Sequence, residues 1–106
     1  MEDDMEYQVV LQFPGSSRDD FDLLIEIEDE LEDWVCEIAD VDGHDFGSGE
    51  MNIFLFTNEP KETFDQAKKV VEQKQLLSVL RAAYRHVESE EYMPLWPKEL
   101  ADFRVL

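Results

Sequence analysis

The stretch Asp40-Val-Asp-Gly-His-Asp-Phe-Gly-Ser-Gly-Glu50 runs directly into Met51-Asn-Ile-Phe-Leu-Phe56. Its first part holds three of the chain's four glycines and four carboxylates. Glycine, aspartate and serine supply the positive φ angles and local hydrogen bonds that tight turns need. Its second part is apolar and aromatic, which is typical of a buried strand. The stretch therefore predicts a β-hairpin, in which a polar loop over residues 40–50 joins a strand at 35–41 to a strand at 51–57.

The residues before this hairpin predict a strand and a long helix. Residues 7–13 alternate between apolar and mostly polar side chains, as expected for a strand with one face on the core. Ser16 or Ser17 is suited to N-cap a helix that runs to about Asp33, with aspartates in its first turn. The apolar stripe of this helix, at three- and four-residue steps, is predicted to consist of Phe21, Leu24, Ile27, Leu31 and Trp34.

The residues after the hairpin predict a second helix and a fourth strand. Asn58 is a good N-cap and Pro60 is tolerated in a first turn, so we expect a helix from there to about Gln75. Residues 78–87 alternate as a strand does. The inner stripe of the second helix is predicted to be Phe64, Ala67, Val70, Val71 and Lys74.

The resulting order, β-α-β-β-α-β, predicts an α+β fold. We expect a ferredoxin-like two-layer sandwich, with two helices on one face of a four-stranded antiparallel sheet. A chain of 106 residues has the usual length of one domain, so residues 1–106 are assigned to a single domain. Residues 1–6 are expected to form an acidic tail, and residues 88–106 a C-terminal extension. Its apolar part, 92–97, is expected to cover the edge or open face of the sheet, or else to dock on a second subunit.

The charge of the chain is concentrated in its first half. The formal net charge is -18, and residues 1–50 hold 18 Asp and Glu against one basic residue, Arg18. Such a field repels phosphate backbones and anionic lipid, so nucleic acid and membrane surfaces are not expected as partners. It favours a basic protein partner or a cation.

Cysteine usage and hydropathy indicate a cytoplasmic protein. Cys36 is the single cysteine, so no disulfide can form within the chain and a reducing compartment fits best. The first six residues are acidic where a secretory signal would be basic, and no apolar run approaches the length of a membrane span. The sequence leaves both a monomer and a homodimer open.

The polar face of the first helix is the first candidate functional surface. It is crowded with carboxylates, and no lysine on the same helix pairs with them. One interpretation is a solvated face. The other is a non-enzymatic interaction module that binds a basic partner, in the manner of an immunity protein or inhibitor, or by imitating the phosphates of DNA. The candidate partner-binding residues are Asp22, Glu26, Asp29, Glu30 and Asp33.

The 40–50 segment is the second candidate, as the centre of a ligand- or metal-binding regulatory domain. Its spacing fails that of an EF-hand, because Asp45 stands where the calcium loop needs glycine. A different oxygen-rich site stays open, beside the plain interpretation of a hairpin loop. No metal or cofactor is assigned. The candidate residues are Asp40, Asp42, His44, Asp45, Ser48 and Glu50.

A third candidate is a hydrolase that uses His44. Cys36 with Asp42, or Ser48 with Asp45, would complete the set of nucleophile, base and orienting group. Nothing in the spacing is diagnostic, and acidic neighbours favour the imidazolium, which opposes a general base. Cys36 is expected to be a small core residue near the start of a strand. No catalytic residue is therefore assigned.

The segment Asp42-Gly-His-Asp-Phe-Gly-Ser-Gly-Glu-Met-Asn-Ile-Phe54 resembles a small, functionally uncharacterised bacterial family. Members of that family share an Asp-Gly-x-Asp-x-Gly-Ser-Gly-Glu-x-Asn-Ile-Phe core, followed by an Asn/Asp-x-Pro helix start. The resemblance covers about residues 36–65. It implies no activity, and the wider likeness to ferredoxin-like domains is one of topology, which does not imply function.

Overall fold

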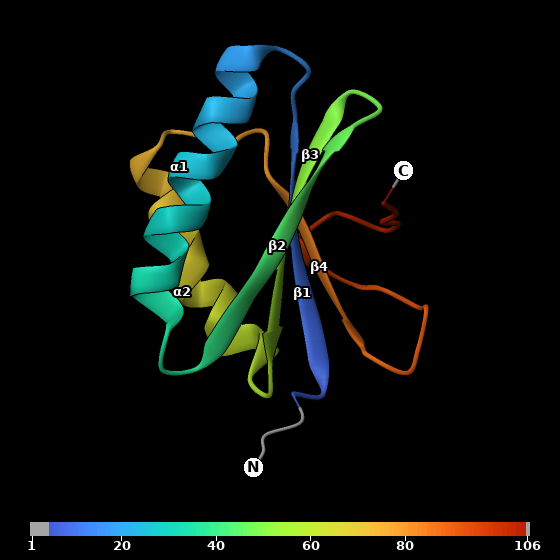
Figure 1. Ribbon diagram of the computed structural model, residues 1–106. Coiled ribbons are helices and arrows are strands. Elements are labelled where there is room, and N and C mark those ends of the chain that lie inside the picture. The colour runs from blue at the N-terminus through green and yellow to red at the C-terminus, as the bar shows by residue number, and fades with distance from the viewer. Residues whose placement is uncertain (1–4, 106) are drawn as a thin grey trace.

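The computed structural model describes residues 5–105 and shows an α+β fold (Figure 1). Residues 1–4 of the expected acidic tail, and residue 106, lie outside the described residues. The elements follow one another in the predicted order, with one addition at the end. They are β1 (Tyr7–Pro14), α1 (Arg18–Val35), β2 (Ala39–Gly47), β3 (Glu50–Thr57), α2 (Pro60–Gln73), β4 (Arg81–His86) and β5 (Met93–Trp96).

The sheet has five strands in the order β2-β3-β1-β4-β5, and every neighbouring pair is antiparallel. Both helices lie on one side of it, and the C-terminal residues after β5 lie on the other (Figure 1). The expectation of four strands was wrong, because the C-terminal extension adds β5 along the outer edge of β4. Residues 92–97 were expected to cover the edge or open face of the sheet, or else to dock on a second subunit, and β5 covers the edge at β4. A short edge strand tolerates proline, which needs no N–H on the solvent side.

The main core lies between the helices and the sheet. The buried stripe of α1 is Leu24, Ile27, Leu31 and Val35. Burying each of these side chains contributes about 1.5–3 kcal/mol, whereas each like-charge pair on the polar face costs only a few tenths of a kcal/mol. Packing therefore outweighs the repulsion and holds the acidic helix in place.

The ends of the predicted stripe on α1 were wrong. Phe21 is 37% exposed and Trp34 is 43% exposed. Val35, assigned from the sequence to a strand, is the last helical residue and takes the core position expected for Trp34. The helix extends further than expected because Val35 continues the four-residue spacing of buried side chains from Leu31.

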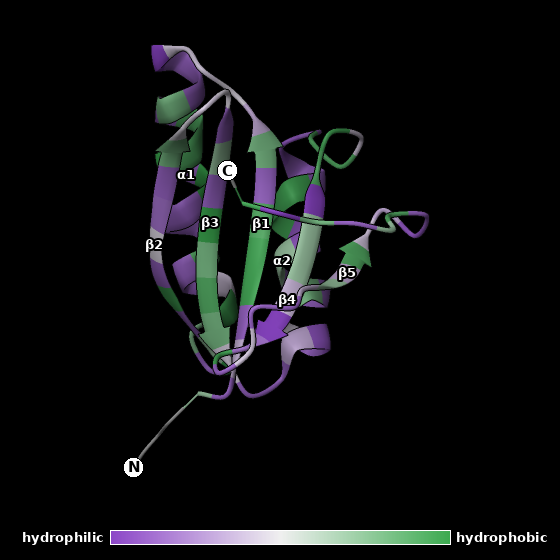
Figure 2. Ribbon diagram, turned by 90° about the vertical axis from the view of Figure 1, so that its right-hand side faces the viewer, coloured by the Kyte–Doolittle hydropathy of each residue, from purple (hydrophilic) through white to green (hydrophobic). Residues whose placement is uncertain are grey.

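A smaller core lies on the opposite face of the sheet. Val10 and Ala83 are buried there beneath Phe103. The ribbon near the C-terminus crosses in front of β4 and β1 on this side (Figure 2). The expectation that β1 has only one buried face was therefore wrong, because this C-terminal segment covers the other face.

Several element boundaries also differ from the prediction. Strand β2 begins at Ala39 rather than residue 35, and α2 ends at Gln73. Asn58 is not the N-cap of α2: Glu59 holds that position, without a side-chain capping bond. The Asn58 side chain instead accepts a hydrogen bond from the Glu6 backbone N–H at 2.9 Å. The amide of Asn58 therefore joins the end of β3 to the residue that precedes β1.

No helix within residues 5–105 is long and apolar enough to cross a bilayer.

Candidate functional site

The N-terminus of α1 is fixed by local hydrogen bonds. Ser17 is the N-cap, and its hydroxyl accepts a hydrogen bond from the Asp20 backbone N–H at 3.1 Å. The Asp20 carboxylate in turn accepts bonds from the backbone N–H groups of Ser16 and Ser17. These bonds, that from Ser16 first, lower the pKa of Asp20. The prediction of a serine cap is confirmed at Ser17, in a full capping box.

Five of the acidic residues of α1 lie on the side of the helix opposite its buried stripe. At about 100° per residue, positions 22, 26, 29 and 33 fall on one side of the helix and the core residues on the other. Asp22, Glu26, Asp29 and Asp33 are exposed, and Glu30 is half-buried. We call these five residues the acidic stripe.

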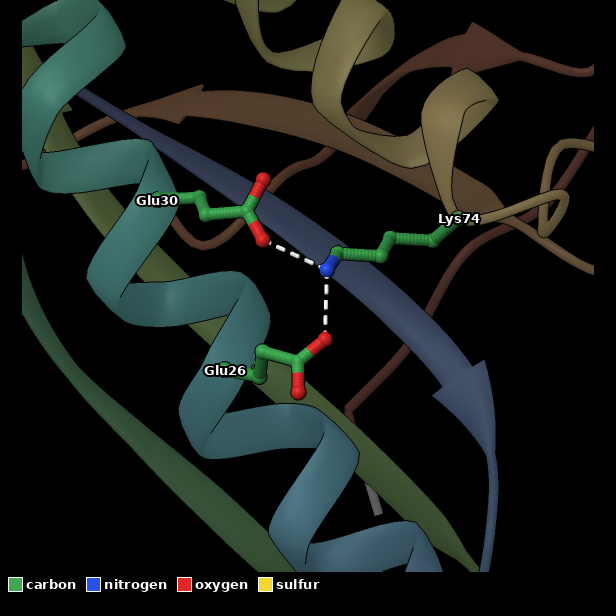
Figure 3. A network of polar contacts seen from close by, with 3 residues as sticks. All are labelled: Glu26, Glu30 and Lys74. Atoms are coloured by element: carbon green, nitrogen blue, oxygen red, sulfur yellow. Dashed lines mark hydrogen bonds and ion pairs between the residues drawn. The ribbon is translucent and has the colours of Figure 1, made fainter.

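Lys74 binds one flank of the acidic stripe (Figure 3). Its ammonium group lies 2.5 Å from a carboxylate oxygen of Glu26 and 2.5 Å from one of Glu30. The Lys74 side chain is only 19% exposed, since it extends from the end of α2 toward α1. The hydrogen bond to Glu26, and then that to Glu30, raises the pKa of Lys74. The first helix carries no lysine of its own, so the cation that pairs with Glu26 and Glu30 comes from the end of α2.

The other three members of the acidic stripe have no such partner. Within residues 5–105, the side chains of Asp22, Asp29 and Asp33 make no ion pair and no hydrogen bond. Their charges therefore face solvent. A basic partner would meet three carboxylates whose charge no residue of the described chain neutralises.

The 40–50 segment is a strand and a tight turn rather than a loop. Residues up to Gly47 pair with β3, so the predicted loop shortens to Ser48 and Gly49. Both turn residues have positive φ, 57° and 81°, which is the geometry of a two-residue hairpin turn. A bulge between Val41 and Gly43 interrupts the pairing. Aspartate and glycine are poor strand formers, but pairing with the strongly β-prone β3 overrides that preference.

The structure divides the loop candidates between the two faces of the sheet. His44 is opposite Ile53, which belongs to the main core, so it lies on the helix side. Asp45 is opposite Asn52, one position along, and lies on the far side. Of the remaining candidates, Asp40 is opposite Phe56, Asp42 lies in the bulge, Ser48 lies in the turn, and Glu50 accepts hydrogen bonds from Gln12 and Asn52.

No metal-ligand cluster emerges from this arrangement. Among the described residues, no group of three or more His, Cys, Asp or Glu side chains is placed to hold a metal ion. His44 lies on the helix side, and Asp40 and Asp45 share the far face but pair with residues four positions apart along β3, so the candidate ligands do not converge.

The candidate catalytic groups also have separate partners. His44 Nδ1 lies 3.1 Å from a carboxylate oxygen of Glu28 on α1, and its ring contacts Phe21 edge-on. Cys36 is exposed at the C-cap of α1, where its thiol donates to the Asp33 backbone carbonyl, so its assignment to the core was wrong. Within residues 5–105, neither Cys36 nor Ser48 hydrogen-bonds to His44. The geometry assembles no nucleophile–base pair around His44.

Two residues lie in surroundings that the sequence did not predict. Trp34 was assigned to the apolar stripe of the first helix but is exposed, and Lys74 was assigned to the inner stripe of the second helix but reaches the carboxylates of α1. The ring of Trp34 lies 6.0 Å from the ammonium group of Lys69 on α2. One available signal was the position of Lys74, which falls on the predicted inner stripe of the second helix. A lysine on an inner stripe needs an anionic neighbour, and the first helix carries an excess of carboxylates.

No protein-family model matches the chain, and neither the curated proteins nor the solved structures include one with significant similarity to it.

Proposed function

We propose that this chain is a non-enzymatic protein-interaction module that binds a basic partner through the acidic stripe of α1. The observation that carries the proposal is the solvent exposure of Asp22, Asp29 and Asp33 without any neutralising residue in the described chain. The underlying helix is held by its buried stripe, so these carboxylates project from a rigid element. A rigid, single-sign surface suits recognition of a complementary charge.

The form we propose is an inhibitor or immunity-type partner of a basic protein, acting in the cytoplasm. Long-range attraction between the acidic stripe and a basic surface would raise the association rate about 10–10³-fold and make it fall as salt is added. Nucleic acid is not proposed as a ligand, because the same field repels phosphates.

We also propose that the two helices and the first four strands form a ferredoxin-like core, to which β5 is an addition. The antiparallel order β2-β3-β1-β4 supports this assignment. The resemblance of residues 36–65 to an uncharacterised bacterial family stays a prediction. A ligand site at residues 40–50 has weaker support, since its candidate residues point to both faces of the sheet.

The proposal is tested with the tagged chain as bait in a native lysate. Capture is measured at about 0.01 M and about 1 M salt, where the Debye length is about 30 Å and about 3 Å. We expect a basic protein to be captured at low salt and lost at high salt. We expect a D29K/D33K double variant to lose it at low salt as well.

The matched control is D65K/E72K, which changes the charge by the same amount on exposed positions of α2. It should retain the partner, because its substitutions leave the acidic stripe intact. Absence of any captured partner, capture that ignores salt, or equal loss in the two double variants would each contradict the proposal.

A further inference from the structure

The contacts between the two helices show which chemistry the flank of α1 accepts. Lys74, at the end of α2, binds Glu26 and Glu30 in the middle of α1 (Figure 3). Nearer the end of α1, the ammonium group of the exposed Lys69 lies 6.0 Å from the ring centroid of Trp34. At both places α2 supplies a cation to α1.

Beyond Trp34 the second helix supplies no cation. The end of α1 and the start of α2 lie at the same end of the molecule (Figure 1), and a hollow of about 350 Å³ opens between them, which we call the Trp34 hollow. Its carboxylates are Asp33, Glu37 and Glu62, and no basic residue of the described chain lines it. Within residues 5–105, none of these three side chains makes an ion pair. Where the flank would receive a third cation, α2 presents a carboxylate.

The ring of Trp34 makes the hollow more than a group of charges. It lines the hollow and is 43% exposed. Tryptophan is the best aromatic partner for a cation and is enriched among the residues that dominate binding energy at interfaces. The half-buried Ile38 adds apolar surface. An apolar wall beside carboxylates matches a side chain that has an apolar stem and a cationic head.

Of the two strongly basic side chains, arginine fits this hollow better. Its planar guanidinium stacks on an indole ring and directs five N–H donors outward in a fork, whereas lysine offers one compact charge. The carboxylates come from three segments, with Asp33 on α1, Glu37 in the turn after it and Glu62 on α2. Lys69 meets the ring only at 6.0 Å, the outer limit of a cation–π contact. That contact is therefore weak enough for a stacked guanidinium to replace it.

We propose that the Trp34 hollow is the docking site for an arginine side chain of the basic partner, with its guanidinium stacked on Trp34 and paired with the carboxylates around it. The inference rests on the proposed function, because Asp33 belongs to both the acidic stripe and the hollow. The stripe attracts any basic surface, and the hollow distinguishes arginine from lysine. The last turn of α1 carries no basic residue, so its dipole favours a cation at this end as well.

The test uses two fluorescent probes, a peptide of seven lysines and the same peptide with an arginine at its centre. Binding to the full-length chain is measured by polarisation at about 0.1 M salt, where charges still attract over about 10 Å. We expect the wild type to bind the arginine peptide about fivefold more tightly, from cation–π attraction at a partly exposed ring. W34A should bind both peptides equally, and W34F should keep part of the preference.

The matched control is F21A, which removes another exposed ring near the opposite end of α1. It should keep the full preference for arginine, and circular dichroism verifies that each variant is folded. Equal binding of the two peptides by the wild type, an unchanged preference in W34A, or an equal loss of preference in F21A would each overturn the arginine site.

A second double variant separates this inference from the proposed function. D22K/D29K changes the acidic stripe outside the hollow, so it should weaken both peptides by the same factor and leave their ratio unchanged. Salt-sensitive binding that D22K/D29K weakens, without any preference for arginine, would overturn the arginine site and leave the proposed function standing. A preference that depends on Trp34, with affinities that ignore D22K/D29K, would support the arginine site and contradict the role of the stripe.

An optical measurement leaves the hollow unaltered. The chain holds two tryptophans, so W96F leaves Trp34 as the only indole. We expect the emission of folded W96F to change saturably with the arginine peptide and much less with the lysine peptide. Emission that stays unchanged at saturating arginine peptide, or that responds equally to both peptides, would overturn stacking on Trp34.

Discussion

The two faces of the sheet are covered in different ways. On one face, two amphipathic helices bury 17 described apolar residues together with the sheet. On the other, the irregular segment of residues 101–105, here called the strap, and its neighbours bury three. The helices are regular elements that present whole stripes of side chains, whereas the strap presents the buried Phe103 and the half-buried Val105. We conclude that the helical face supplies most of the burial that holds the chain folded, and that the strap face supplies less.

The largest expected effect tests the helical face. Leu31 is fully buried at the centre of the α1 stripe. We expect Leu31→Ala to reduce the free energy of unfolding by about 3–4 kcal/mol, through lost burial and a residual cavity. Urea unfolding followed by circular dichroism measures it. A loss below that of F103A would contradict the ranking of the two faces.

The next effect tests the strap face. Phe103→Ala removes a buried side chain at least as large as that of Leu31. We nevertheless expect the free energy of unfolding to fall by only about 1–3 kcal/mol, because the strap can detach without unfolding the sheet. Hydrogen exchange should show faster exchange at the strap and unchanged protection in α1 and β3. Global loss of protection would show that the two faces are one cooperative unit.

A smaller effect tests whether ion pairs assist the helical layer. Lys74→Met keeps the apolar stem and removes the ammonium group shared by Glu26 and Glu30. Because the folded state raises the pKa of Lys74, its contribution is fully present below the ordinary value of 10.5 and is lost as pH rises through the raised value. Wild type should therefore melt above the variant at neutral pH, and the gap should close in strong alkali or 1 M salt. If the difference in melting temperature persists unchanged in strong alkali and in 1 M salt, it arises from packing rather than from the ion pairs.

The smallest effect has the opposite sign. Asp33 lies in the last turn of α1, where no basic residue is present to complement the helix dipole. We expect Asp33→Lys to raise the free energy of unfolding by about 0.3–1 kcal/mol, by placing a cation there and relieving repulsion from Asp29. Thermal melts against Asp65→Lys, which changes charge in the middle of α2, separate the positional effect from the change in net charge. If the two variants raise the melting temperature equally, the stabilisation does not depend on the position at the end of α1.

Local patterns predicted the element order well. Ser17, the stripe from Leu24 to Leu31, and the strand at 51–57 depend on residues near one another in sequence, so their periodicity and capping chemistry are visible. The acidic stripe was predicted for the same reason. Its exposure followed directly from helical spacing.

Features that depend on distant partners were missed. Residues 42–47 became strand because β3 pairs with them, although aspartate and glycine favour a loop. Lys74 contacts Glu26, which is 48 residues away in the sequence, and Gln12 donates a hydrogen bond to Arg104, which is 92 residues away. The irregular strap has no periodicity from which its position could be inferred. Such contacts are set by the tertiary arrangement, which single-sequence patterns do not encode.

Strand β2 has a consequence for how the protein behaves when concentrated. It is one edge of the sheet, and its backbone groups on the outer side are available to another strand. Asp40, Asp42 and Asp45 are exposed and charge that edge, and a bulge at Asp42 interrupts its pairing. The opposite edge, β5, is four residues long and contains Pro94. Both borders therefore resist the strand-to-strand stacking that leads to amyloid, and the acidity of residues 40–45 protects solubility whether or not a partner is bound.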